Sequence, residues 1–156
     1  IMVGTHSRTK AGFVTSGLRL PGVAAEEREV AQRTEELIDF LDLGPLASRK
    51  VVELTFATRK RVELARALAA YPTLLLLDEP AAGLSHEEVE SLASTILHIR
   101  DRLGVSILLV EHHMNLVMRV SDHIIALDFG RKIADGLPKD VRDNAEVIRA
   151  YLGAAQ

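Results

Sequence analysis

The sequence predicts an α/β fold with parallel core strands, intervening helices and a helical subdomain before them. Two short apolar runs, at 74–78 and 105–111, are typical of strands in a parallel sheet. A segment with apolar residues at helical spacing separates them, and this order predicts a strand–helix–strand crossover. From Ala24 to the first of these runs, apolar residues also recur mostly at helical spacing.

The first 72 residues are expected to form an N-terminal loop and the helical subdomain. Residues 1–21 carry scattered glycines and no clear opening strand, so we expect a loop with short helical pieces. A first helix is predicted from Ala24 to about Leu41, before Gly44 and Pro45. A second is predicted over about 58–70, where Tyr71 and Pro72 end it.

Residues 73–136 are expected to form the core of the sheet. The leucines at 74–77 predict a strand buried on both faces, which Pro80 would end. Ser85 and Glu88 match a capping box and predict the start of a helix that Gly104 closes. The next elements are predicted as a strand at 105–111, a short helix at 114–120, a strand at 123–128 and a hairpin strand at 131–134. Residues 137–156 are expected to form a helical tail with a helix at 146–152.

Composition narrows the classes of function. The 156 residues suffice for one sizeable core, and 47% hydrophobic with 26% charged residues is ordinary for a soluble globular protein. A net charge of −3, 4% aromatic residues and no Trp argue against nucleic acid as a partner. The absence of Cys excludes disulfides and thiolate metal sites.

Asp78 and Glu79 follow the leucine run, where a parallel strand leaves the sheet and ligands usually bind. One carboxylate there could help to hold Mg²⁺ while the other polarises a water that attacks a phosphate. The alternative is that both acids only cap the next helix, and the strand alone leaves both possibilities open. His112 and His113 end the next strand, so they are expected beside these acids.

Several segments together resemble the ATP-binding subunit of ABC transporters, in particular the group that serves branched-chain amino acid importers. The segments follow the order of that family. Residues 54–68 correspond to the signature region and its helix, 74–79 to the Walker B strand with its glutamate, and 81–85 to the D-loop. Residues 111–114 contain the switch histidine, and 128–136 with 147–153 correspond to the characteristic ending. The resemblance covers nearly all of the chain and implies the P-loop NTPase fold of ABC ATPases.

The resemblance implies roles for individual residues. Asp78 would help to hold Mg²⁺ through water, Glu79 would activate the attacking water, and His112 would sense the γ-phosphate of ATP. The signature region, which is Thr55, Phe56, Ala57 and Thr58, would bind phosphate through backbone N–H groups, and Ser85 would belong to the nucleotide-contacting D-loop. The implied cofactors are ATP and Mg²⁺. The implied partners are membrane permease subunits and a second ATPase subunit in a head-to-tail dimer, at the cytoplasmic face of the cell membrane.

The departures from the family are informative. No G-x-x-x-x-G-K-[ST] phosphate loop is present, so the chain looks like the C-terminal portion of a larger domain. Ala57 stands where the family has Gly, Thr55 where it has Ser, and Ser85 where it usually has Asp or Asn. A Cβ at position 57 would obstruct a close phosphate contact if that residue needed a positive φ. We therefore expect very weak ATP binding and no meaningful hydrolysis from this chain alone.

The missing phosphate-loop strand would lie between the strands at 105–111 and 123–128, which predicts two unpaired strand edges. Those edges could close on each other, another chain could fill the gap, or the chain could be a piece of a longer protein. We expect the last of these, or a self-association that hides the edges. Two other functions stay open: a soluble ABC ATPase of DNA repair or translation, and a non-catalytic module that completes a partner's site. The basic residues 59–61 could assist anion binding or form a solvated helix turn.

Overall fold

The computed structural model describes residues 1–7 and 21–152, which form two compact units. One unit contains residues 1–76 and 103–108, and the other contains residues 77–102 and 109–156. The division passes through the paired strands β1 (Leu74–Asp78) and β2 (Ser106–Val110).

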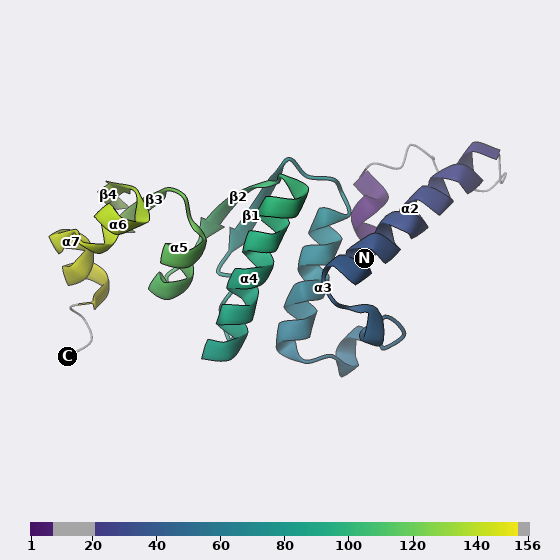
Figure 1. Ribbon diagram of the computed structural model, residues 1–156, viewed down its shortest axis with the longest axis horizontal. Helices are drawn as coiled ribbons and strands as arrows, with labels where there is room; N and C mark the ends of the chain where they lie inside the picture. Colours follow the sequence, from purple (N-terminus) through teal and green to yellow (C-terminus); the bar gives the residue numbers. More distant parts are fainter. Residues whose placement is uncertain (8–20, 153–156) are drawn as a thin grey trace. The chain divides into compact units, whose positions relative to one another are not determined.

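The first unit contains the helices of the N-terminal half of the chain (Figure 1). Its helices are η1 (Met2–Ser7), α2 (Pro21–Phe40), η2 (Gly44–Leu46), η3 (Val51–Glu53) and α3 (Phe56–Leu68). Both predicted long helices are present, within three residues of the predicted start of each. Helices η1 and α3 pack closely at Gly4 of η1. A Cβ at this position would overlap the carbonyl oxygen of Arg66 in α3, so the contact requires glycine. The predicted loop at 8–20 lies outside the described residues.

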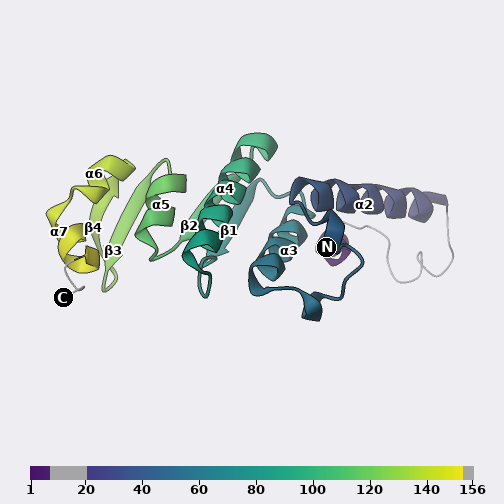
Figure 2. The same cartoon turned by 60° about the horizontal axis from the view of Figure 1, so that its bottom comes forward.

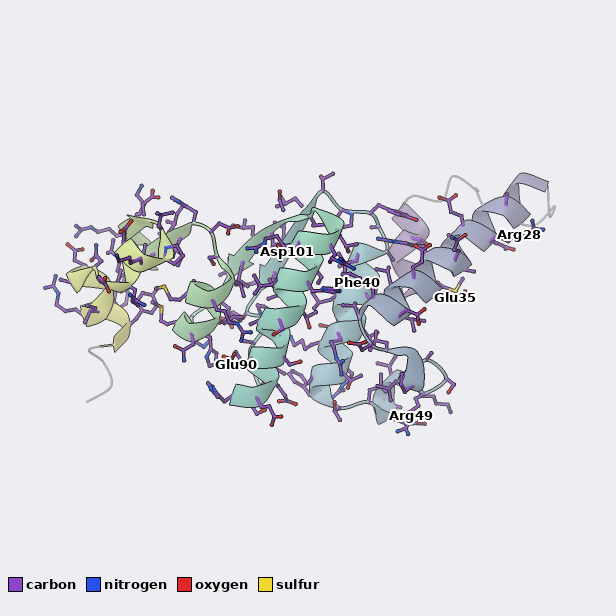
Figure 3. All side chains as sticks on the ribbon, viewed as in Figure 1. Arg28, Glu35, Phe40, Arg49, Glu90 and Asp101 are labelled. Carbon is purple, nitrogen blue, oxygen red and sulfur yellow. The ribbon has the colours of Figure 1, made fainter. Side chains whose placement is uncertain are left out.

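Strands β1 and β2 pair in parallel and are joined through α4 (His86–Leu103). The N–H of Ser106 donates to the Thr73 carbonyl at one end (3.0 Å), and the N–H of Glu79 donates to the Val110 carbonyl at the other (2.9 Å). The hydrogen-bonded residues follow the same direction along both segments, from Thr73 to Glu79 and from Ser106 to Val110, so the two strands are parallel. Helix α4 carries two acids that form ion pairs, Glu90 with Arg119 and Asp101 with Arg100. Figure 3 labels both acids.

The rest of the second unit is a small antiparallel hairpin with its own core (Figure 2). Strands β3 (Ile124–Asp128) and β4 (Arg131–Gly136) pair with an irregularity between Ala126 and Leu127. Around them lie α5 (Met114–Val120), α6 (Pro138–Arg142), α7 (Ala145–Val147) and the π-helix η4 (Ile148–Leu152). The buried centre is formed by Ile124, Ala126, Val141 and Val147. The Tyr151 hydroxyl ties the tail to β3 by donating to the Leu127 carbonyl (2.6 Å).

The prediction that the leucine strand is buried on both faces is wrong for this chain. Leu75 is 5% exposed, but its neighbours Leu74 and Leu76 are 52% and 65% exposed. Successive side chains of a strand point to opposite faces, and only one face is covered by the described residues. The same alternation leaves apolar side chains exposed on β2 and β3, at Leu108, Val110, Ile125 and Leu127.

Strands β2 and β3 belong to separate two-stranded sheets among the described residues. Of the three outcomes expected for the predicted strand edges, the one in which they close on each other is therefore wrong. The backbone groups of an edge strand remain available for pairing with another segment. In the described part of the chain, no helix combines the length and the apolarity needed to cross a membrane.

Candidate functional site

The two acids predicted as site residues lie where β1 ends. The Asp78 and Glu79 side chains are both exposed, whereas the following Pro80 is buried. Glu79 has a φ of +43°, a left-handed conformation that costs a non-glycine residue about 1–2 kcal/mol. Its N–H is held by the Val110 carbonyl, and its own carbonyl accepts the N–H of Ala82 at 3.1 Å. The strained backbone at the proposed catalytic glutamate is thus fixed on both sides by hydrogen bonds.

The structure brings His112 to this glutamate. The Nδ1 of His112 lies 3.5 Å from the Oε1 of Glu79, and the two side chains are 62% and 56% exposed. Both groups are therefore near each other and accessible to a ligand. His113 is also exposed, and its ring stacks on that of His112 at a centroid distance of 5.6 Å.

A third acid, Glu111, belongs to the same cluster and was not predicted as a site residue. Its Oε1 accepts the N–H of Ala81 (2.9 Å), and its Oε2 accepts the N–H groups of His112 (2.8 Å) and His113 (2.9 Å). The side chain is 0% exposed. Burial by itself raises the pKa of Glu111, but the three backbone N–H donors and nearby His112 outweigh it, so the pKa is lowered. Glu111 is thus a buried anion held by main-chain groups.

The sequence carried a usable signal for Glu111. It follows Ile107 and Leu109 at two-residue spacing, on the more buried side of β2. An acid on that side needs hydrogen-bond donors, because a buried unpaired carboxylate is very costly.

The loop that resembles the D-loop is ordered by turns and by the start of α4. Ala81 is buried, and Gly83 adopts a φ of +78° that favours glycine. The predicted capping box is confirmed: Ser85 donates its N–H to Glu88 (2.8 Å), and the N–H of Glu88 donates to the Ser85 hydroxyl (3.4 Å). The N–H and hydroxyl of Ser85 lower the pKa of Glu88. The Ser85 hydroxyl therefore already has a structural partner.

The signature region lies in the first unit, at the start of α3. Thr55 is the N-cap residue, and its hydroxyl accepts the N–H of Thr58 (3.3 Å) and lies 2.9 Å from the Thr58 hydroxyl. Ala57 lies within the helix and is absent from the positive-φ residues, so the condition under which its Cβ would be strained is not met. Phe56 is 45% exposed, with Arg59 and Lys60 over its ring at 5.7 and 5.5 Å. A phosphate contact here would depend on backbone N–H groups rather than on the Thr55 hydroxyl.

The acids at the end of β1 could supply only a minority of the ligands of a Mg²⁺ ion. Among the described residues, no three His, Asp or Glu side chains are grouped as a metal site. Magnesium commonly takes one or two carboxylates and fills its remaining positions with water and substrate phosphates. Asp78 suits that arrangement, and the ion would then depend on a bound nucleotide.

Two family descriptions match the chain. The ABC transporter family matches residues 3–82, and the branched-chain amino acid ATP-binding cassette transporter family matches residues 131–156. The second match covers much of the ending that was identified from the sequence.

Individual relatives of the chain also belong to transport systems. The chain is 37% identical over 155 residues to the high-affinity branched-chain amino acid transport ATP-binding protein BraF of Pseudomonas aeruginosa, covering 99% of this chain and 61% of BraF. It is 35% identical to the zinc import ATP-binding protein ZnuC of Alkalilimnicola ehrlichii, covering 97% of this chain and 62% of ZnuC. The solved structure of cbiO1 from Clostridium perfringens, part of the ABC transporter complex cbiONQ, superimposes with a TM-score of 0.72 at 30% identity over 88% of this chain and 53% of cbiO1. The chain thus spans less than two thirds of the length of these relatives.

Proposed function

Because the chain belongs to the ABC transporter ATP-binding family, we propose that it works within an ATP-binding subunit that drives branched-chain amino acid uptake. The observation that carries the proposal is the pairing of exposed Glu79 and His112, 3.5 Å apart, where two parallel strands end. This edge of an α/β sheet is the usual place for a ligand.

Each side chain has a chemical task in this proposal. Glu79 accepts a proton from the water that attacks the γ-phosphate of ATP, and His112 hydrogen-bonds to that phosphate. Asp78 holds Mg²⁺ through water, and the ion supplies positive charge opposite the phosphates when bound. The N–H groups at the start of α3 and the loop at 81–85 provide further nucleotide contacts.

The proposed substrate class rests on the end of the chain. Overall identity does not discriminate, since BraF and ZnuC match almost equally well and their names specify different cargo. The match of residues 131–156 to the branched-chain amino acid family is the more specific support.

We propose that the partners are membrane permease subunits and a second ATP-binding subunit arranged head to tail. Association with the permease would place the protein peripherally at the cytoplasmic face of the membrane. Without these partners, the edges of β2 and β3 that have no partner strand among the described residues, and the exposed apolar side chains of these strands, favour self-association. Sedimentation velocity over a concentration series measures this: a monomer at every concentration would contradict it.

A titration of the 156-residue chain with ATP and Mg²⁺ tests its own capacity. The sequence contains no phosphate loop, and the amides and lysine of such a loop bind the β- and γ-phosphates. We expect very weak binding and no meaningful hydrolysis, whereas a chain extended by a phosphate-loop segment should bind ATP. Micromolar ATP affinity of the 156-residue chain would contradict the expectation.

A non-catalytic role is the second candidate. It is favoured by the capped start of α3, which could complete a partner's nucleotide site without any hydrolysis at Glu79. In a reconstituted assembly, Glu79→Gln separates the two functions: loss of hydrolysis supports the ATPase, and unchanged activity supports the module.

A further inference from the structure

Glu111 is the one acid at the end of β1 and β2 with no role in the proposed reaction. It does not face a ligand, because its side chain is 0% exposed. Its carboxylate instead has three backbone N–H partners that come from two different loops.

The two oxygens of Glu111 have separate tasks. Oε1 accepts the N–H of Ala81, which begins the loop after Glu79 and lies 30 positions away in the chain. Oε2 accepts the N–H groups of His112 and His113 and lies 3.7 Å from the Nδ1 of His112. The carboxylate thereby bridges the segment that bears Glu79 and the segment that bears His112.

Local capping does not account for this arrangement. The bonds to His112 and His113 could serve only to order the residues before α5, as a cap does. The bond to Ala81 adds nothing to α5, and it crosses between chain segments. Charge-assisted bonds are about twice as strong as neutral ones, so a buried carboxylate suits a rigid connection.

We propose that Glu111 is a positioning residue that fixes the loop at 81–85 and the His112 backbone relative to each other. A displacement of either loop is then passed to the other, and Glu79 and His112 keep their short separation. The inference deepens the proposed ATPase function and rests on it for its catalytic meaning, but the bridge itself is a property of the 156-residue chain.

Amide exchange and NMR of this chain test the bridge without any nucleotide. Glu111→Gln should lower the protection on one side of the bridge by about tenfold or more, either at Ala81 or at His112 and His113, because the amide has one acceptor oxygen and cannot accept on both sides. Glu88→Gln is the matched control, since Glu88 also accepts a backbone N–H. It should leave the Ala81 amide unchanged.

Glu111→Asp keeps the charge on a shorter side chain, and it tests the bridge even if the Gln variant does not fold. We expect it to retain protection at His112 and His113 while the Ala81 amide loses its protection. An Ala81 amide that stays protected in the Asp variant, or protection that is unchanged at all three amides in a folded Gln variant, overturns the proposal.

The catalytic consequence is measured in a phosphate-loop-extended chain assembled with its permease. Glu111→Gln should lower kcat about tenfold with little change in KM, and Glu111→Asp should recover part of it. If kcat is unchanged by Glu111→Gln although Glu79→Gln abolishes hydrolysis, the positioning role is wrong and the ATPase function stands. If Glu79→Gln has no effect, the proposed function fails, while the amide result still reports on the bridge.

Discussion

The end of β1 and β2 and the start of α3 are both proposed to contact nucleotide, but they offer a ligand different groups. At the strand ends, Glu79 and His112 keep more than half of their side chains exposed. At the start of α3, the Thr55 hydroxyl is bonded within its own helix turn. The first region therefore presents side-chain chemistry, and the second presents main-chain N–H groups.

The two regions are therefore expected to tolerate different substitutions. A region that acts through side chains should fail when a functional group changes. A region that acts through its backbone should accept Thr for Ser or Ala for Gly as long as the helix still begins at the same residue. Two of the departures from the family, at Thr55 and Ala57, lie in the backbone-dependent region.

The largest expected effect is on Glu79 in an assembled, phosphate-loop-extended protein. Glu79→Gln removes the proposed general base and should lower the rate of ATP hydrolysis by about 10²–10⁴-fold. Phosphate release measures the rate, and Glu87→Gln, an exposed acid in the first turn of α4, serves as the control. Equal rates in both variants would remove the chemical difference between the two regions.

The next effect concerns the cap of α3. Thr55→Ala removes the acceptor for the N–H of Thr58 and should lower the free energy of unfolding by about 1 kcal/mol. Thr55→Ser keeps the hydroxyl and should preserve most of that stability. Urea denaturation compares the variants, and an equal loss in both would mean that the methyl group, not the cap, matters.

A similar effect is expected from the backbone of Glu79. Because its φ is +43°, Glu79→Gly should be about 1 kcal/mol more stable than Glu79→Ala. At Glu87, inside α4, the order should reverse, since Gly is a poorer helix former than Ala. Thermal or urea unfolding of the four variants checks the sign, and Gly less stable than Ala at position 79 would contradict the strain.

Elements with a local signal were predictable from the sequence. The capping box at Ser85 and Glu88 marks the start of α4, and Gly104, with a φ of +63°, follows its end. The strands at 105–111 and 123–128 and the helix at 114–120 are also close to β2, β3 and α5. Helix α6 was not predicted, although Pro138 at its first turn is a recognised start signal.

Features that depend on distant contacts were harder to predict. The leucine run gives no information on which face is covered, because its residues are alike on both sides. The bridge from Glu111 to Ala81 joins residues 30 positions apart, and no spacing rule links them. The proximity of Glu79 and His112 was expected, since carboxyl ends of parallel strands meet at one edge.

The smallest expected effect distinguishes the two helix starts by pH. The Ser85 N–H and hydroxyl lower the pKa of Glu88, so their bonds to the carboxylate stabilise the folded state above the unfolded pKa. This contribution is lost as the pH falls through the lower folded pKa. The Ser85 amide proton signal should therefore shift between about pH 6 and about pH 3 in the wild type, and much less in Glu88→Gln. At the start of α3 the Thr58 amide is bonded to a hydroxyl, which does not titrate in this range, so its signal should stay nearly constant. A Ser85 signal that moves equally in both proteins would show that the Glu88 carboxylate does not determine the start of α4.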